Sequence, residues 1–199
     1  MNPYATVAEF KASSGLQSTA DDAHIQLCLD AAAAALEGYC NRGPLVADAV
    51  ESAREYAVLT MTGWHQIDEC IAVTLVETRS SASESWSVLS DYTVASGGPF
   101  FPRFGQSPYS WLYRDSGWPS VMGLPTLRVT ARWGYSEVVP HQVKLAVIGQ
   151  ATRWFKRGQS SWADTLASDA VGQLFFRRDL DPDIAMMLRN ARLVRPTLG

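Results

Sequence analysis

The sequence has 199 residues, of which 47% are hydrophobic and 19% are charged, so it can bury a core and is neither intrinsically disordered nor a coiled coil. Its 17 Lys and Arg residues against 20 Asp and Glu residues give a net charge of -3, which does not indicate a protein whose main role is to bind nucleic acid. Its longest apolar run, 31–36, is far shorter than the roughly 20 residues of a membrane-spanning helix, and we expect no secretory signal at the N-terminus.

The chain opens with two predicted helices. Residues 6–14 begin with a capping box, because the hydroxyl of Thr6 stands three residues before the carboxylate of Glu9. A longer helix is predicted over 21–40, where apolar residues recur at helical spacing and form one stripe. The residues at 41–44, with Gly and Pro, end this helix.

The middle of the chain predicts β-structure. Alternation of apolar and polar side chains predicts strands at 71–76 and 127–133, shorter strands at 84–89 and 92–95, and an ambiguous strand at 53–60. The segment at about 97–123 is rich in Gly, Pro, Ser and aromatic residues. We expect it to form a long excursion loop with a functional role.

The last part of the chain predicts helices again. A helix begins at Pro140 and runs to about residue 157, with Trp154 and Phe155 on its apolar stripe and their rings expected in the core. Further helical turns are expected within 160–171. A last helix begins at 181–183, where Pro follows Asp.

These elements predict a mainly α fold, a helical bundle with an inserted small antiparallel β-sheet. The helices before and after the insertion must pack together, because neither stripe has another partner. We expect N-terminal helices over 1–50, a β-rich insertion over 51–135, and C-terminal helices with a basic tail over 136–199, all in a single structural unit.

Charge is distributed unevenly along the chain. Residues 1–151 hold 9 basic and 15 acidic residues, a net of -6, whereas residues 152–199 hold 8 and 5, a net of +3. A basic end of this kind is typical either of a solvated tail or of an interaction segment.

The sequence carries no motif of a catalytic, cofactor or metal site. It has no GxSxG elbow, phosphate-binding glycine loop, GxGxxG, CxxC or HxxxH. The nearest cluster, His65 to Cys70, is interpreted as a turn. The three cysteines, Cys28, Cys40 and Cys70, are predicted to be reduced, buried thiols of a cytosolic protein. We therefore expect no enzyme, with an unrecognised site in the 97–123 loop as the alternative.

Several phrases, in their order along the chain, carry a family resemblance. They are YATVAEFK (4–11), GYCNR (38–42), WSVLSDYTV (86–94), LRVTARWGY (127–135) and DPDI (181–184). Together they span nearly the whole sequence. In this order they resemble the head-to-tail connector adaptors of long-tailed bacteriophages, which are also called head-completion or head-tail joining proteins.

The resemblance implies a structural virion protein of the neck, assembled in the host cytoplasm. It implies a ring, typically of twelve copies, that docks under the portal protein and contacts a stopper or tail-completion protein. Packaged DNA would pass through the ring without sequence recognition, and no cofactor or membrane is implied. A ring needs two different surfaces on each subunit, and an acidic lumen would let DNA slide without adhering.

Two sets of residues are predicted to carry these contacts. Portal docking is assigned to Phe175, Phe176, Arg177, Arg178, Arg189, Arg192 and Arg195. Contact with a neighbouring subunit or with the stopper is assigned to Phe100, Phe101, Trp111, Tyr113 and Trp118. The alternative function is a small DNA-binding or packaging accessory protein that uses the Arg-rich C-terminal segment, which a salt-dependent affinity for duplex DNA would favour.

Overall fold

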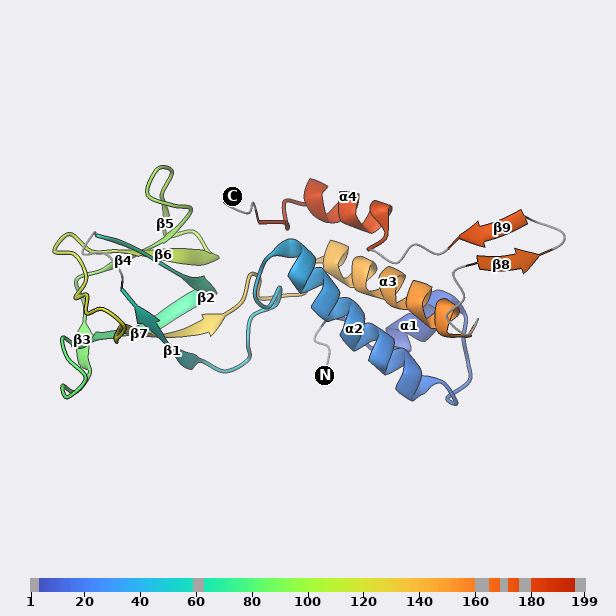
Figure 1. Ribbon diagram of the computed structural model, residues 1–199, viewed down its shortest axis with the longest axis horizontal. Helices are drawn as coiled ribbons and strands as arrows, with labels where there is room; N and C mark the ends of the chain where they lie inside the picture. Colours follow the sequence, from blue (N-terminus) through green and yellow to red (C-terminus); the bar gives the residue numbers. More distant parts are fainter. Residues whose placement is uncertain (1–3, 59–62, 160–164, 169–171, 176–179, 196–199) are drawn as a thin grey trace. The chain divides into compact units, whose positions relative to one another are not determined.

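The computed structural model describes residues 4–58, 63–159, 165–168, 172–175 and 180–195. The chain divides into two compact units. The helical unit comprises Met1–Arg42 and Val139–Gly199, and the strand unit comprises Gly43–Val138 (Figure 1). The domain boundaries expected from the sequence stay predictions.

The helical unit contains four helices and a hairpin in its described part. These are α1 (Val7–Ser14), α2 (Asp22–Cys40), α3 (His141–Gln159), β8 (Thr165–Ser168), β9 (Gly172–Phe175) and α4 (Pro182–Asn190). The helices at both ends of the chain are therefore confirmed. The helical turns expected within 160–171 are wrong for residues 165–168, which pair with β9 as a strand.

The capping box at the start of α1 is confirmed. The Thr6 hydroxyl accepts a hydrogen bond from the Glu9 amide at 3.2 Å, and the Glu9 carboxylate accepts one from the Thr6 amide at 2.9 Å. The same carboxylate forms an ion pair with Lys144 of α3 at 2.6 Å. One residue thus satisfies a helix end and also joins two helices.

Aromatic packing joins α1 to α3. The rings of Phe10 and Phe155 meet edge to face with centroids 5.7 Å apart, and both side chains are buried. The core position predicted for Phe155 is confirmed, whereas Trp154 is half-buried. Small residues of α2, including Ala32 and Ala33, are buried where α2 packs along α3.

The last helix is tied to the others at both of its ends. The Asp181 carboxylate caps α4 by accepting from the Asp183 amide at 2.9 Å, and it pairs with Arg153 of α3 at 2.7 Å. After α4 the chain returns to the end of α2, where the Arg195 amide donates to the Cys40 carbonyl at 2.9 Å. Leu188 is fully buried, so α4 belongs to the core of the helical unit.

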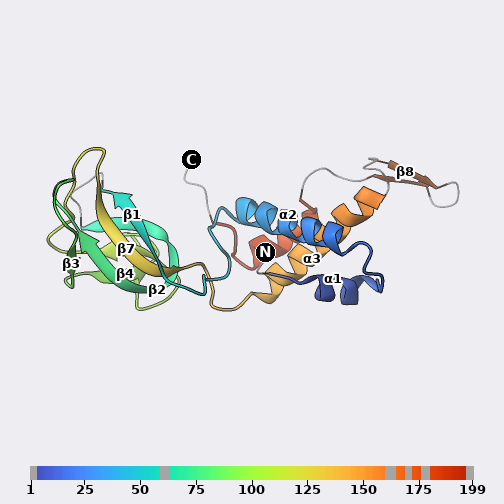
Figure 2. The same ribbon diagram turned by 90° about the horizontal axis from the view of Figure 1, so that it is seen from below.

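The strand unit is one antiparallel sheet of seven strands (Figure 2). Its strands are β1 (Ser52–Ala57), β2 (Trp64–Thr78), β3 (Ser87–Leu89), β4 (Thr93–Ser96), β5 (Arg103–Phe104), β6 (Tyr109–Tyr113) and β7 (Pro125–Trp133). The order across the sheet is β1, β7, β2, β6, β4, β5, and β3 pairs separately with β2.

The long strand β2 organises this sheet. Along one edge its residues 70–78 pair with β7, and along the other edge residues 64–70 pair with β6 and residues 76–78 pair with β3. The register shifts at three places along these ladders, which bends the strand. The sheet closes over its own core, which comprises Val58, Ile67, Cys70, Val76, Leu112, Trp118, Leu127, Val129, Ala131 and Trp133.

The segments that enter and leave the strand unit run side by side. The Asp48 amide donates to the Trp133 carbonyl at 2.8 Å, and the Ala47 amide donates to the Ser136 carbonyl at 2.8 Å. Gly134 between them has a φ of 142°, and a Cβ there would lie 2.4 Å from the Cα of Ala47. Only glycine allows the two segments to approach so closely.

The predicted fold class, a mainly α helical bundle with a small inserted sheet, is wrong. The sheet has seven strands and a hydrophobic core of its own. The sequence understates it because β2 carries polar residues at 65, 66, 68 and 69 and irregular pairing, which obscure a period of two. The predicted 97–123 loop also contains β5 and β6.

We expect the three cysteine thiols to be unreactive in the folded protein. All three are buried, and burial raises the pKa of the Cys28 thiol, that of Cys40 to about 11 and that of Cys70 to about 12. Since the thiolate is the reactive form, Ellman's reagent at neutral pH should detect no thiol before unfolding and three after it. A thiol that reacts in the folded protein as fast as free cysteine contradicts this burial.

The Glu9 carboxylate should make the stability of the helical unit depend on pH. Its bonds with Lys144 and the Thr6 amide hold its pKa below the ordinary value of 4.5. A lowered pKa stabilises the fold above pH 4.5, and this contribution is lost as the pH falls through the folded-state pKa.

The test is E9Q, which keeps a capping side chain and removes the charge. We expect a loss of up to about 1 kcal/mol at neutral pH, because the pair is partly exposed, and a difference from wild type that disappears in acid. Urea unfolding followed by the helical circular dichroism signal measures it. E51Q, at an exposed carboxylate of the strand unit, is the control, and an E9Q loss that persists in acid would contradict the ion pair.

Candidate interaction surfaces

The described residues include exposed apolar side chains and hollows at the surface. No group of three or more His, Cys, Asp or Glu side chains among them could hold a metal ion. The turn predicted at His65 to Cys70 is wrong, because these residues lie in β2 and Asp68 pairs with Arg54 of β1 at 2.7 Å. Burial lowers the pKa of His65. None of the described helices has both the length and the apolar composition that crossing a bilayer requires.

The most exposed aromatic residues lie between β4 and β5. We define residues 97–104 as the aromatic loop. Phe100 is 88% exposed and Phe101 is 84% exposed, so neither ring contributes to a core. The Phe101 amide donates to the Gly98 carbonyl at 3.1 Å, and Gly97 has a φ of 78°, which favours glycine. The turn therefore presents two adjacent phenylalanine rings to solvent.

An aromatic cluster supports the end of this loop. The ring of Trp64 lies 4.7 Å from Tyr113, 6.4 Å from Trp111 and 6.0 Å from Phe104, measured between centroids. The side chains of Trp111 and Tyr113 are half-buried in β6. The cluster joins β2, β5 and β6, so it anchors the aromatic loop.

Trp118 lies apart from the exposed aromatic residues. It is 1% exposed, belongs to the core of the strand unit, and its indole N–H donates to the Gly63 carbonyl at 3.0 Å. The structure thus separates the predicted contact residues: Phe100 and Phe101 are exposed, Trp111 and Tyr113 are half-buried, and Trp118 is internal. The local sequence around Trp118, with glycine before it and proline after it, does not predict whether the side chain is buried or exposed.

An apolar groove lies beside the uncovered part of β2. Strand β6 ends its pairing at Cys70 and β3 begins at Val76, so residues 71–75 have no strand opposite this edge among the described residues. The groove has a volume of about 500 Å³. Its lining residues are Val73, Thr74, Leu75, Val76, Val88, Leu89, Ser90, Tyr92, Thr93 and Val94. The sequence did not predict this groove, which depends on where two strands stop.

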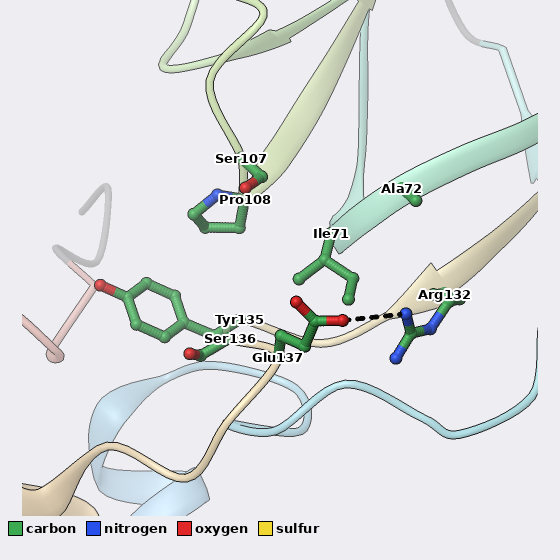
Figure 3. Close-up of a pocket in the computed structure, with 8 residues that line it drawn as sticks. All are labelled: Ile71, Ala72, Ser107, Pro108, Arg132, Tyr135, Ser136 and Glu137. Carbon is green, nitrogen blue, oxygen red and sulfur yellow. Dashed lines mark hydrogen bonds and ion pairs between the residues drawn. The ribbon is translucent and has the colours of Figure 1, made fainter.

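A second hollow, of about 440 Å³, lies at the neighbouring end of the same stretch of β2 (Figure 3). It is lined by Ile71 and Ala72 of β2, by Ser107 and Pro108 before β6, by Arg132 of β7, and by residues 135–137 after β7. Arg132 and Glu137 pair across it at 3.4 Å. The guanidinium therefore already has a partner, and the hollow presents no free cation.

The basic end of the helical unit is only partly described. Arg189 and Arg192 are exposed, and the guanidinium of Arg189 lies 5.7 Å from the ring of Tyr39. Arg195 is half-buried and its amide binds the end of α2. The backbone of Phe175 ends β9, and the predicted docking residues at 176–178 lie outside the described residues.

Two arginines enclose Trp86 beside β3, an arrangement that sequence reasoning missed. The guanidinium carbons of Arg79 and Arg128 lie 4.4 Å and 4.7 Å from its ring centroid. Arg128 also makes two hydrogen bonds to the Glu77 carboxylate, at 2.7 and 2.8 Å. These contacts fasten the segment before β3 to the sheet, which favours a structural role.

Comparison with known proteins shows that the fold of this chain is similar to that of chains in solved structures. No family model and no curated protein matches the sequence. The chain is similar to one in the structure described as "Neck of empty GTA particle computed with C6 symmetry", with a TM-score of 0.60 at 16% identity. It is also similar to one in "Virion of native gene transfer agent (GTA) particle", with a TM-score of 0.61 at 15% identity. Both matches cover 98% of this chain and 93% of the other.

The exposure of the side chains predicts a negligible loss of stability for substitutions in the aromatic loop and a large loss for substitution of Trp118. F100S/F101S should leave the free energy of unfolding within about 0.5 kcal/mol of wild type, because both rings are already in water. W118A should lower it by about 3–5 kcal/mol, because it empties a core site. Urea unfolding of the three proteins measures both values, and a large loss in F100S/F101S would mean that the loop packs against the fold.

Proposed function

We propose that this chain is a non-enzymatic structural protein in the neck of a phage-like particle. The observation that carries the proposal is a likeness of fold that extends over both units, with 98% of this chain and 93% of the chain from a GTA neck covered. The order of sequence phrases that resembles the head-to-tail adaptors supports the same function independently. The sequence also lacks catalytic motifs.

Within the neck the chain forms a ring between the portal and a stopper or tail-completion protein, and packaged DNA passes through it. The GTA neck was computed with C6 symmetry, with which a ring of twelve copies is compatible. A ring requires two different surfaces on each copy. The exposed aromatic loop and the apolar groove are two such surfaces on the strand unit.

Portal docking falls to the C-terminal segment. Its described part is held in place, because Leu188 and Leu193 are buried and the Arg195 amide binds α2. Arg189 and Arg192 are left exposed on this support. Exposed cations on a rigid support suit an acidic partner surface, where complementary charge speeds association and sets orientation.

Imaging of particles tests the location. An epitope tag on this chain, bound by an antibody fragment, should add density beneath the portal in electron micrographs of finished particles. Particles assembled without the chain should fill their heads with DNA and lack tails. Tagged density elsewhere, or complete tailed particles without the chain, would refute the proposal.

Two exposed cations of the helical unit provide a matched test of docking. R192Q should weaken capture of the purified portal protein several-fold at low salt, whereas K156Q, at an exposed residue of α3, should not. The R192Q effect should shrink as salt rises, because exposed charges are screened. Equal capture by both variants would remove Arg192 from the docking surface. A salt-dependent affinity of wild type for duplex DNA, lost in R192Q, would favour the DNA-binding alternative.

A further inference from the structure

We propose that the aromatic loop of one copy inserts Phe100 and Phe101 into the apolar groove of a neighbouring copy. The inference deepens the proposed function and rests on it for the ring, since it identifies the two surfaces that would join subunits. Both surfaces lie within the strand unit of the chain. The occupant of the groove is a second copy of this protein, because every copy carries both two exposed phenylalanine rings and an apolar groove that suits them.

The groove is suited to aromatic side chains. Valines 73, 76, 88 and 94 and Leu75 line it together with Leu89 and Tyr92. Val88 is 67% exposed although it lies in a strand. No strand in the described part of the chain pairs with 71–75 on this edge, which leaves the groove open along β2. An exposed apolar hollow of this kind is typical of an interaction site.

The aromatic loop has the properties that such a groove requires. Its two rings are almost fully exposed, and the turn that presents them is held by the hydrogen bond from Phe101 to Gly98. Because its geometry is already set, binding orders few additional groups. Phe104 packs on Trp64, so the loop is anchored at its base.

The loop and groove of one copy lie at opposite ends of β4. Thr93 and Val94 at the start of this strand line the groove, and the loop follows Ser96 at its end. The strand holds the two sites apart within a copy, so contact between copies is favoured. Two different patches that bind each other form head-to-tail contacts, which close into a ring or extend into a filament.

Charged residues border both sites. The loop carries one charged residue, Arg103, which is exposed and makes no ion pair with the described residues. The groove is bordered by Asp91, whose side chain stays 55% exposed although it pairs with Arg114. Because Arg114 already holds this carboxylate, an approaching Arg103 would share it, so charge adds a preference for this orientation while the apolar surfaces supply the attraction.

The size of the contact predicts its strength. Two phenylalanine side chains bury about 150–250 Å² each, so with the groove wall the contact stays below the roughly 1,200–2,000 Å² of a stable interface. A single contact is therefore weak, and assembly depends on each copy making two contacts in a closed ring. Detection requires covalent trapping.

The experiment traps the contact with a short bismaleimide in the purified protein. P102C places a thiol on the loop next to the two phenylalanine rings, which both stay in place, and V88C places one at the groove; both positions are exposed, so substitution does not threaten folding. The three native cysteines are buried and serve as an unreactive background. P102C mixed with V88C should give cross-linked dimers about tenfold faster than P102C mixed with a control, because docking raises the effective concentration.

The matched control is V50C, at a valine of the strand unit that is 76% exposed and lies outside the groove. A V88C rate equal to the V50C rate overturns the proposal, as does P102C cross-linking fastest with itself, which would mean loop-to-loop contact. The test uses this chain alone. Its failure would leave the neck location standing, whereas failed particle imaging with successful trapping would remove the location and keep the contact.

Discussion

Gly134 and the paired segments around it are the constraint on which the strand unit depends. The chain enters the unit near Ala47 and leaves it near Ser136, and backbone hydrogen bonds hold these two segments together. A side chain at Gly134 would collide with the backbone of Ala47. Because the ends of the insertion meet, α2 before it and α3 after it can pack as neighbours, although about 100 residues separate them along the chain.

Strand β2 determines which surfaces the unit presents. It is long enough to pair with β7 on one edge and with both β6 and β3 on the other. These two partners leave residues 71–75 uncovered among the described residues, and the apolar groove follows from that interval. The aromatic residues of the unit fall into two groups. Trp118 and Trp133 are buried in the core, whereas Phe100 and Phe101 are exposed to solvent.

The exposed loop and the hollows of the strand unit are its candidate contact surfaces. The described residues form no metal cluster, and the hollow beside Arg132 holds an ion pair of its own. Likeness of fold to chains of gene transfer agent particles extends through nearly the whole chain at 15–16% identity. Such likeness establishes a fold, and the function proposed from it depends on the exposed loop, the groove and the basic end.

The sequence by itself determined the helices, because their signals are local. The capping box at Thr6, the proline before α3 and the Asp-Pro at α4 act within one turn of the chain. Phe155 was likewise placed in the core by its spacing on a helical stripe. Strand β7 was recognisable for the same reason, since it alternates cleanly.

Only the tertiary structure decided the extent of the sheet, the groove and the fate of each aromatic side chain. Strands β1, β2 and β6 are stabilised by partners far away in sequence, and their irregular registers hide the period of two. A groove exists where partner strands stop, which no local pattern encodes. Trp118 lies between Gly117 and Pro119, and Phe101 follows the Gly and Pro residues at 97–99, yet one ring is buried and the other exposed, because burial depends on long-range packing.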